Sequence, residues 1–125
     1  MVRSIISMAI VFILLIAVAI YETDFVSRQF NEFSVALEML YDKVETETAV
    51  KDDVIAVQNN WIKKKEVLHV FIPHNDIKEV DLWLSESVSL VQDKKWEDAL
   101  SKVEVLKELA EQIPKNFVVS LENIL

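Results

Sequence analysis

The chain has 125 residues, of which 13 are basic and 21 acidic, and it contains no Cys and no Gly. This length suffices for one compact domain behind an N-terminal apolar stretch, and the net charge of −8 argues against nucleic acid and anionic lipid headgroups as partners. The missing residue types exclude disulfides, thiol nucleophiles and Cys-ligated zinc, and also phosphate-binding loops, dinucleotide fingerprints and calcium loops, which need glycine.

The first predicted element is a membrane span from Ser4 to Tyr21, which carries no charged side chain. A helix needs about 17–25 apolar residues to cross the hydrocarbon core of a bilayer, and residues 5–21 meet the lower limit. We therefore predict a transmembrane anchor over residues 1–21 that contacts membrane lipid through residues 4–21.

The residues that flank the span predict its orientation. Arg3 precedes the span, and Glu22 and Asp24 follow it. The positive-inside rule then places the N-terminus in the cytoplasm and the domain outside the cytoplasmic membrane. A cleaved signal peptide is the alternative, because Ala17-Val18-Ala19 has the small-x-small pattern of a cleavage site. Residues 1–19 would then be absent from the mature protein.

Beyond the span, apolar residues recur in steps of three and four, as in helices that pack on one another. The pattern predicts a first helix from the span to Glu45 and further helices over residues 49–71, 76–91 and 94–113. Amphipathic helices with short connections pack most simply as an antiparallel up-and-down bundle. We therefore predict an all-α fold in which the transmembrane helix continues into a four-helix bundle over residues 22–114. Helical hairpins of the tetratricopeptide kind are the weaker alternative, because no repeat of about 34 residues is visible.

Capping residues and prolines mark the predicted boundaries of these helices. The candidate caps are Thr46 or Thr48 for the second helix, His74 or Asn75 for the third and Asp93 for the fourth. Pro73 and Pro114 are predicted to end the second and fourth helices, because proline disfavours helical conformation in the residue before it. Lys63, Lys64 and Lys65 are predicted to form a solvated face at which the packing of the second helix loosens.

The C-terminal segment, residues 115–125, is predicted to be a docking tail. Its apolar side chains, Phe117, Leu121, Ile124 and Leu125 among them, are too hydrophobic to remain in water. Ser120 is expected to cap one short helical turn. We expect the tail to pack on the bundle or on a partner.

Glu66 and His69 form an E-x-x-H pattern, and His74 follows shortly after. Residues three apart on a helix share a face, and di-iron bundles use this spacing, but those sites need a second copy that the chain lacks. A metal-binding bundle that uses Glu66, His69 and His74 is therefore only an alternative. The simpler interpretation is a surface Glu, a partly buried His and a polar helix cap. No nucleophile motif is present, so we expect no catalytic residue, no cofactor, no metal and no enzymatic activity.

Trp61, Trp83 and Trp96 fall on or beside the predicted helical seams. Packing in the core is the favoured interpretation. The alternative is an aromatic-lined ligand pocket inside the bundle, as in extracytoplasmic sensor domains.

Several short patterns carry a resemblance to a family. They are W-x-x-K-K-x-x-L from Trp61 to Leu68, His74 near a helix start, L-K-E-L-x-E-x-I from Leu106 to Ile113, and S-L-E-N-I-L from Ser120 to Leu125. The chain resembles small single-span membrane proteins of unknown function from anaerobic, spore-forming Gram-positive bacteria. The resemblance implies an all-helical extracytoplasmic domain with no established activity. It also implies a neighbouring gene that encodes a multi-pass membrane protein, and hence a membrane partner.

These observations favour an accessory or interaction protein that partners an integral membrane protein or a second copy of itself. The candidate interaction residues are those that heptad packing does not explain, namely His74, Phe117, Ser120, Leu121, Asn123 and Ile124.

Overall fold

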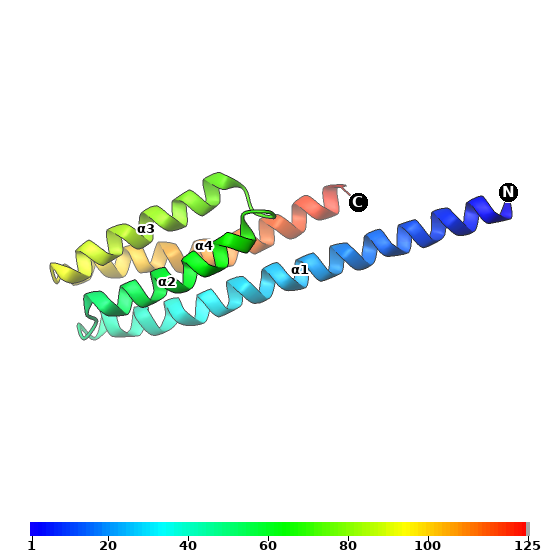
Figure 1. Cartoon of the computed structure of the whole chain (residues 1–125). Coiled ribbons are helices and arrows are strands. Elements are labelled where there is room, and N and C mark those ends of the chain that lie inside the picture. Colours follow the sequence, from blue (N-terminus) through cyan, green and yellow to red (C-terminus); the bar gives the residue numbers. More distant parts are fainter. Residues whose placement is uncertain (125) are drawn as a thin grey trace.

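α1 is a single helix from Val2 to Glu45 in the computed structural model of the chain, which describes residues 1–124. Residues 1–18 are all exposed, and the N-terminal part of α1 projects beyond the other helices (Figure 1). Ala19 is the first partly buried residue. From Val26 to Val44 the helix buries its apolar stripe in the bundle. The predicted continuity of the apolar segment with the first bundle helix is confirmed.

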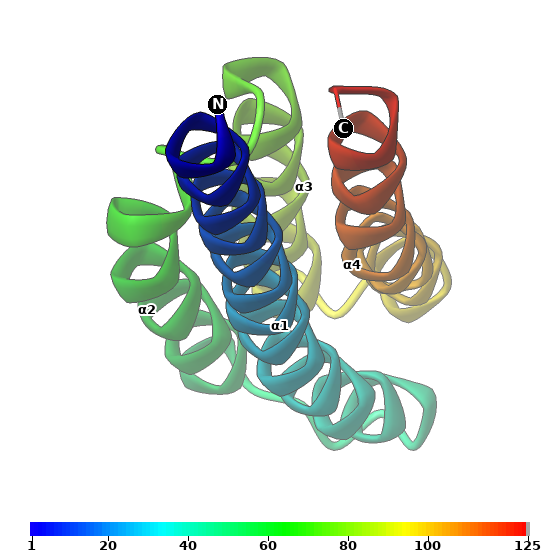
Figure 2. The same cartoon turned by 90° about the vertical axis from the view of Figure 1, so that its right-hand side faces the viewer.

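Three further helices complete the bundle. α2 covers Lys51–Leu68, α3 covers His74–Gln92 and α4 covers Trp96–Ile124. The helices form a ring in which α1 packs on α2 and α4, and α3 packs on the same two; Figure 2 shows this arrangement from the end at which α1 projects. The predicted all-α, up-and-down four-helix bundle is confirmed, and residues 1–124 contain no strand.

Trp61 is the largest fully buried side chain of the core. Its ring centroid lies 4.9 Å from that of Phe33 and 6.0 Å from that of Phe30, both on α1. The indole Nε1–H donates a hydrogen bond of 2.8 Å to Asp81 Oδ1 on α3. The core interpretation of Trp61 is therefore confirmed, whereas Trp83 and Trp96 are only partly buried at the edge of the core.

Two helices end in the same backbone motif. Glu47 follows α1 with φ 59°, and Lys94 follows α3 with φ 56°. After α1, the N–H of Thr48 donates to Lys43 C=O (2.8 Å) and that of Glu47 to Val44 C=O (3.0 Å). After α3, Lys95 N–H donates to Leu90 C=O (2.9 Å) and Lys94 N–H to Val91 C=O (3.1 Å). These are Schellman motifs, which usually place glycine at the left-handed position.

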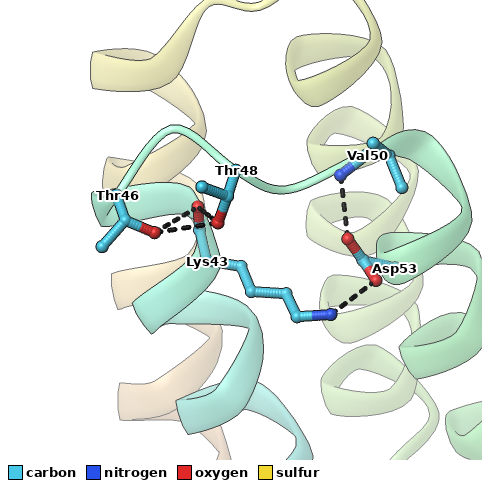
Figure 3. A network of polar contacts seen from close by, with 5 residues as sticks. All are labelled: Lys43, Thr46, Thr48, Val50 and Asp53. Carbon is cyan, nitrogen blue, oxygen red and sulfur yellow. Dashed lines mark hydrogen bonds and ion pairs between the residues drawn. The ribbon is translucent and has the colours of Figure 1, made fainter.

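The threonines between α1 and α2 cap the helix before them, and the prediction that one of them caps α2 is wrong. Thr46 Oγ1 donates to Asp42 C=O (3.0 Å), and Thr48 Oγ1 donates to Lys43 C=O (3.3 Å). α2 instead begins after Val50, whose N–H donates to Asp53 Oδ2 (2.9 Å), while Lys43 Nζ reaches Asp53 Oδ1 (2.9 Å; Figure 3). The Val50 N–H and the Lys43 ammonium hold the pKa of Asp53 below its usual value.

α2 ends at Leu68, before the predicted limit, and a turn over residues 69–73 leads into α3. Both Phe71 N–H and Ile72 N–H donate to Leu68 C=O at 2.9 Å. Pro73 occupies the N-cap position of α3, and His74 is the first helical residue. The predictions that His74 or Asn75 caps α3 and that Asp93 caps α4 are wrong, because Asp93 is the C-cap of α3.

Pro114 lies inside α4, and the prediction that it ends the helix is wrong. Proline has no N–H to offer to the carbonyl of Ala110 and usually bends or breaks a helix. Here the apolar spacing continues past it, because Phe117 and Leu121 follow Ile113 at intervals of four residues. Packing of these side chains keeps the segment helical to Ile124.

Lys64 is buried, with 8% of its side chain exposed, so the prediction that it is solvated and loosens the packing is wrong. Its ammonium donates to Glu32 Oε2 and, at 3.2 Å, to Gln29 Oε1, both on α1. A lysine buries its aliphatic stem along apolar surface while its charge reaches a polar partner. The same contact, through the hydrogen bond and the charge of Lys64, holds the pKa of Glu32 below its usual value.

Lysines also bridge the other three interfaces of the ring. Lys65 of α2 binds Asp81 of α3 (3.1 Å), and Lys102 of α4 approaches Glu86 of α3 (3.6 Å). Lys107 of α4 binds Glu38 of α1 at 3.0 Å and lies 4.1 Å from the ring centroid of Tyr41. The hydrogen bond to Glu38 raises the pKa of Lys107, and burial raises the pKa of Tyr41.

Candidate interaction surface

The bundle has two unlike ends. One end carries the connections α1–α2 and α3–α4. The other, which we call the base, carries the turn over residues 69–73 and the last turns of α4 over residues 117–124, beside residues 19–27 of α1. The bare part of α1 projects from the base (Figures 1 and 2).

Three phenylalanines hold the base together. Phe71 in the turn lies 6.0 Å from Phe25 of α1 and 6.1 Å from Phe117 of α4, measured between ring centroids. Each ring comes from a different part of the chain, and the contacts have the tilted and edge-on geometry that aromatic pairs prefer. The cluster fixes the turn at the height of Phe25, just after α1 becomes amphipathic.

The end of α4 reaches further along α1. A groove of about 450 Å³ is lined by Ile16, Ala19, Ile20, Thr23, Asp24 and Ser27 on α1 and by Val118, Leu121 and Glu122 on α4. Because the helices are antiparallel, the last turn of α4 lies beside Ile16 to Ile20. α4 therefore extends past Tyr21 and overlaps the predicted span.

Three exposed aliphatic side chains lie at the base. Val70 in the turn is 72% exposed, and Val119 and Ile124 of α4 are 53% and 79% exposed. Val70 and Val119 are not among the interaction residues predicted from the sequence, although Val119 belongs to the predicted apolar tail. The signal that could have found Val70 is its place in an apolar run just before Pro73, where the helical spacing of α2 breaks.

The structure brings the predicted interaction residues to this one end. His74 starts α3 directly after the turn and is exposed. Phe117 packs on Phe71, and Leu121 is partly buried in the groove with α1. Ser120, Asn123 and Ile124 are exposed. The tail is thus the end of α4 and not a separate short turn begun by Ser120, and its last residue, Leu125, lies outside the described residues.

The metal-site alternative gains nothing from the geometry. Among residues 1–124, no group of three or more His, Asp or Glu side chains is placed to hold a metal ion. His69, expected to be partly buried, is exposed, as is Glu66, and His69 Nδ1 lies 3.3 Å from the carbonyl oxygen of Lys65 in its own helix.

The tryptophan pocket also gains no support. Trp61 is enclosed by Phe30 and Phe33, and its indole N–H is satisfied by Asp81. A larger groove, about 710 Å³, lies on the outside of α1 and α4, and its lining is mostly polar, including Arg28, Glu38 and Lys107, with no tryptophan.

α1 is the helix of residues 1–124 that is long and apolar enough to cross a membrane, and none of its most apolar stretch is buried within the protein.

Comparison with known proteins gives one assignment. The family described as Domain of unknown function (DUF4363) matches residues 19–124. No curated protein and no solved structure matches the chain.

Proposed function

The chain belongs to the DUF4363 family, which covers the whole bundle from residue 19 to residue 124, and from this premise we propose that it is a membrane-anchored interaction protein without enzymatic activity. In this proposal α1 crosses the cytoplasmic membrane with its N-terminus inside, and the bundle stands outside. The bundle binds an integral membrane protein or a second copy of the chain.

One observation carries the anchoring. The bare segment of α1, residues 2–18, corresponds to about 26 Å of helix at 1.5 Å per residue. This approaches the roughly 30 Å thickness of the hydrocarbon core. The end of α4 lies beside the bare segment only from Ile16 onward, so the helix is uncovered over most of the length for which lipid would cover it.

The absence of a hinge supports an accessory role. α1 passes from the bare segment to the packed segment without a break, and no glycine occurs in the chain. A flexible tether would let the bundle search the volume above the membrane, whereas a continuous helix holds it at one height. A fixed height suits a partner that is itself held in the membrane.

The anchoring is tested by N-terminal sequencing of the mature protein and by its extraction behaviour. We expect an intact N-terminus and release only with detergent. A mature N-terminus at Ile20, which would follow cleavage after Ala19, would overturn the anchored protein in favour of a secreted bundle.

The interaction role is tested by gentle detergent extraction of tagged full-length protein and identification of the proteins that co-purify. We expect one integral membrane protein, or a second copy of the chain, at constant stoichiometry. Deletion of Ser120–Leu125 is expected to abolish this co-purification, and Met39→Ser at an exposed site far from the base serves as the control. Co-purification that survives the deletion would rule out the end of α4 as the contact.

A further inference from the structure

We propose that the base of the bundle is itself a lipid-contacting surface, in which Val70, Val119 and Ile124 insert into the interface of the membrane that α1 crosses. The inference rests on the proposed anchoring and extends it from one contact with the membrane to three. The added contacts are the turn between α2 and α3 and the end of α4.

The height of Val70 above the membrane follows from the position of its turn along α1. Phe71 touches Phe25, with ring centroids 6.0 Å apart, and Phe25 lies four residues beyond Tyr21. Four residues of helix rise about 6 Å, and the headgroup region adds about 5–8 Å to each side of the hydrocarbon core. With α1 upright, the turn that carries Val70 therefore lies at headgroup height.

The end of α4 lies lower still. Leu121 and Glu122 line a groove with Ile16, Ala19 and Ile20 of α1. These α1 residues lie one to five positions before Tyr21, so the last turn of α4 lies about 2–8 Å on the acyl-chain side of the boundary between headgroups and acyl chains. In water, the 79% exposure of Ile124 would leave apolar surface uncovered, whereas lipid at this height covers it.

The chemistry of the base selects the kind of lipid contact. The exposed side chains are aliphatic, and the charged groups beside them on α1 and α4 include the acidic residues Glu22 and Glu122, while Asp24 is paired with Arg28 (3.2 Å). Carboxylates repel anionic headgroups, so the contact depends on apolar insertion of the kind made by interfacial helices, which lie about 5–10 Å into the boundary. The base therefore contacts the interface of a zwitterionic lipid bilayer. Because the contact is apolar, its strength does not depend on salt.

The chain offers a direct test because it has no native cysteine. Four single-cysteine variants of the full-length protein, Val70→Cys, Val119→Cys, Met39→Cys and Leu14→Cys, are labelled with a nitroxide and reconstituted into phosphatidylcholine nanodiscs. Met39 is the matched control, an exposed apolar residue (64%) far from the base, and Leu14 reports on the span. Collision of each label with oxygen and with a water-soluble nickel chelate is measured by power-saturation electron paramagnetic resonance.

We expect the oxygen-to-nickel ratio at positions 70 and 119 to be several-fold higher than at position 39 and lower than at position 14, at low and high salt alike. A high ratio at position 14 with equal, low ratios at 39, 70 and 119 would overturn the lipid contact and leave the anchoring intact. A low ratio at position 14 would overturn the anchoring itself. Labels at 70 and 119 that are shielded from both reagents would show that protein, such as a second copy, covers the base in place of lipid.

Discussion

Trp61 and Asp81 join two helices through one hydrogen bond, in which the indole Nε1–H donates to Asp81 Oδ1 over 2.8 Å. Lys65, one turn after Trp61 on the same face of α2, binds the same carboxylate at 3.1 Å. The carboxylate therefore satisfies a donor from the core and a charge at the surface.

Replacement of Asp81 separates these two roles. Asp81→Asn keeps an acceptor for the indole and removes the charge pair with the partly exposed Lys65, so we expect a loss of no more than about 1 kcal/mol in the free energy of unfolding. Asp81→Leu leaves the buried indole N–H unsatisfied, which costs about 1–3 kcal/mol. Urea denaturation in detergent, followed by tryptophan fluorescence, measures both. Equal losses for the two variants would show that the indole donor contributes nothing.

Lys63 and Lys64 are adjacent, and only Lys64 is buried. Lys64→Glu places a carboxylate at a buried position facing Glu32, and we expect a loss of about 2–4 kcal/mol. Lys63→Glu makes the same change of charge at an exposed position, and we expect an effect of about 0.5 kcal/mol. Thermal unfolding followed by circular dichroism compares the pair. Lys64→Met keeps the aliphatic stem, and its predicted cost is below about 1.5 kcal/mol.

Asp53 gives the fold a dependence on acid pH. Its pKa in the folded protein is below the ordinary value of 3.8, so its stabilising contribution is complete well above pH 3.8 and is lost as the pH falls through the folded pKa. Asp53→Ala is expected to cost about 1 kcal/mol near neutral pH, as for loss of a helix cap. The difference from wild type shrinks as the pH falls below about 4.

The matched control is Asp52→Ala, in the first turn of the same helix. Asp52 is exposed, and its loss removes only an interaction with the helix dipole, about 0.5 kcal/mol. Denaturant titrations at several pH values between 3 and 7 compare the two variants. A cost for Asp53→Ala that stays constant over this range would contradict the assigned cap.

The two left-handed residues offer a gain in stability. Glu47 (φ 59°) and Lys94 (φ 56°) adopt a conformation that costs a residue with a Cβ about 1–2 kcal/mol. Glu47→Gly and Lys94→Gly relieve this cost and also raise the entropy of the unfolded chain, so we expect a net gain of about 0.5–1 kcal/mol each. Glu45→Gly, at the last residue of α1, is the control, and its predicted effect is a loss. Destabilisation by both glycines at positions 47 and 94 would refute the assignment.

The helices could be predicted where a repeating apolar face is enough to determine the secondary structure. The apolar stripe from Val26 to Val44 repeats without interruption, and it predicted both the first bundle helix and its continuity with the apolar segment. The same spacing also continues through Ile113, Phe117 and Leu121. The local preference of Pro114 to end a helix is outweighed by this repeat, because the segment after it packs against α1 and Phe71.

The polar contacts were less predictable, because they depend on which helices become neighbours. The sequence predicted a solvated Lys64, because its partners Gln29 and Glu32 lie more than thirty residues earlier in the chain. Only the packing of α1 on α2 brings these partners opposite Lys64. Thr46 and Thr48 could have capped either adjoining helix, and the left-handed turn at Glu47 directs both towards α1. The residues of the candidate surface were found in part, since His74 and the end of α4 were predicted and Val70 was not.

The single helix that joins the bare segment to the bundle also makes the molecule a lever. The packed part of α1, from Ala19 to Glu45, extends about 40 Å beyond the bare segment at 1.5 Å per residue. Transmembrane helices adapt to bilayer thickness by tilting, on average by about 20°, and such a tilt would displace the α1–α2 connection sideways by about 14 Å. Under the proposed anchoring, a change in membrane thickness is converted into lateral movement at the end of the bundle farthest from the lipid.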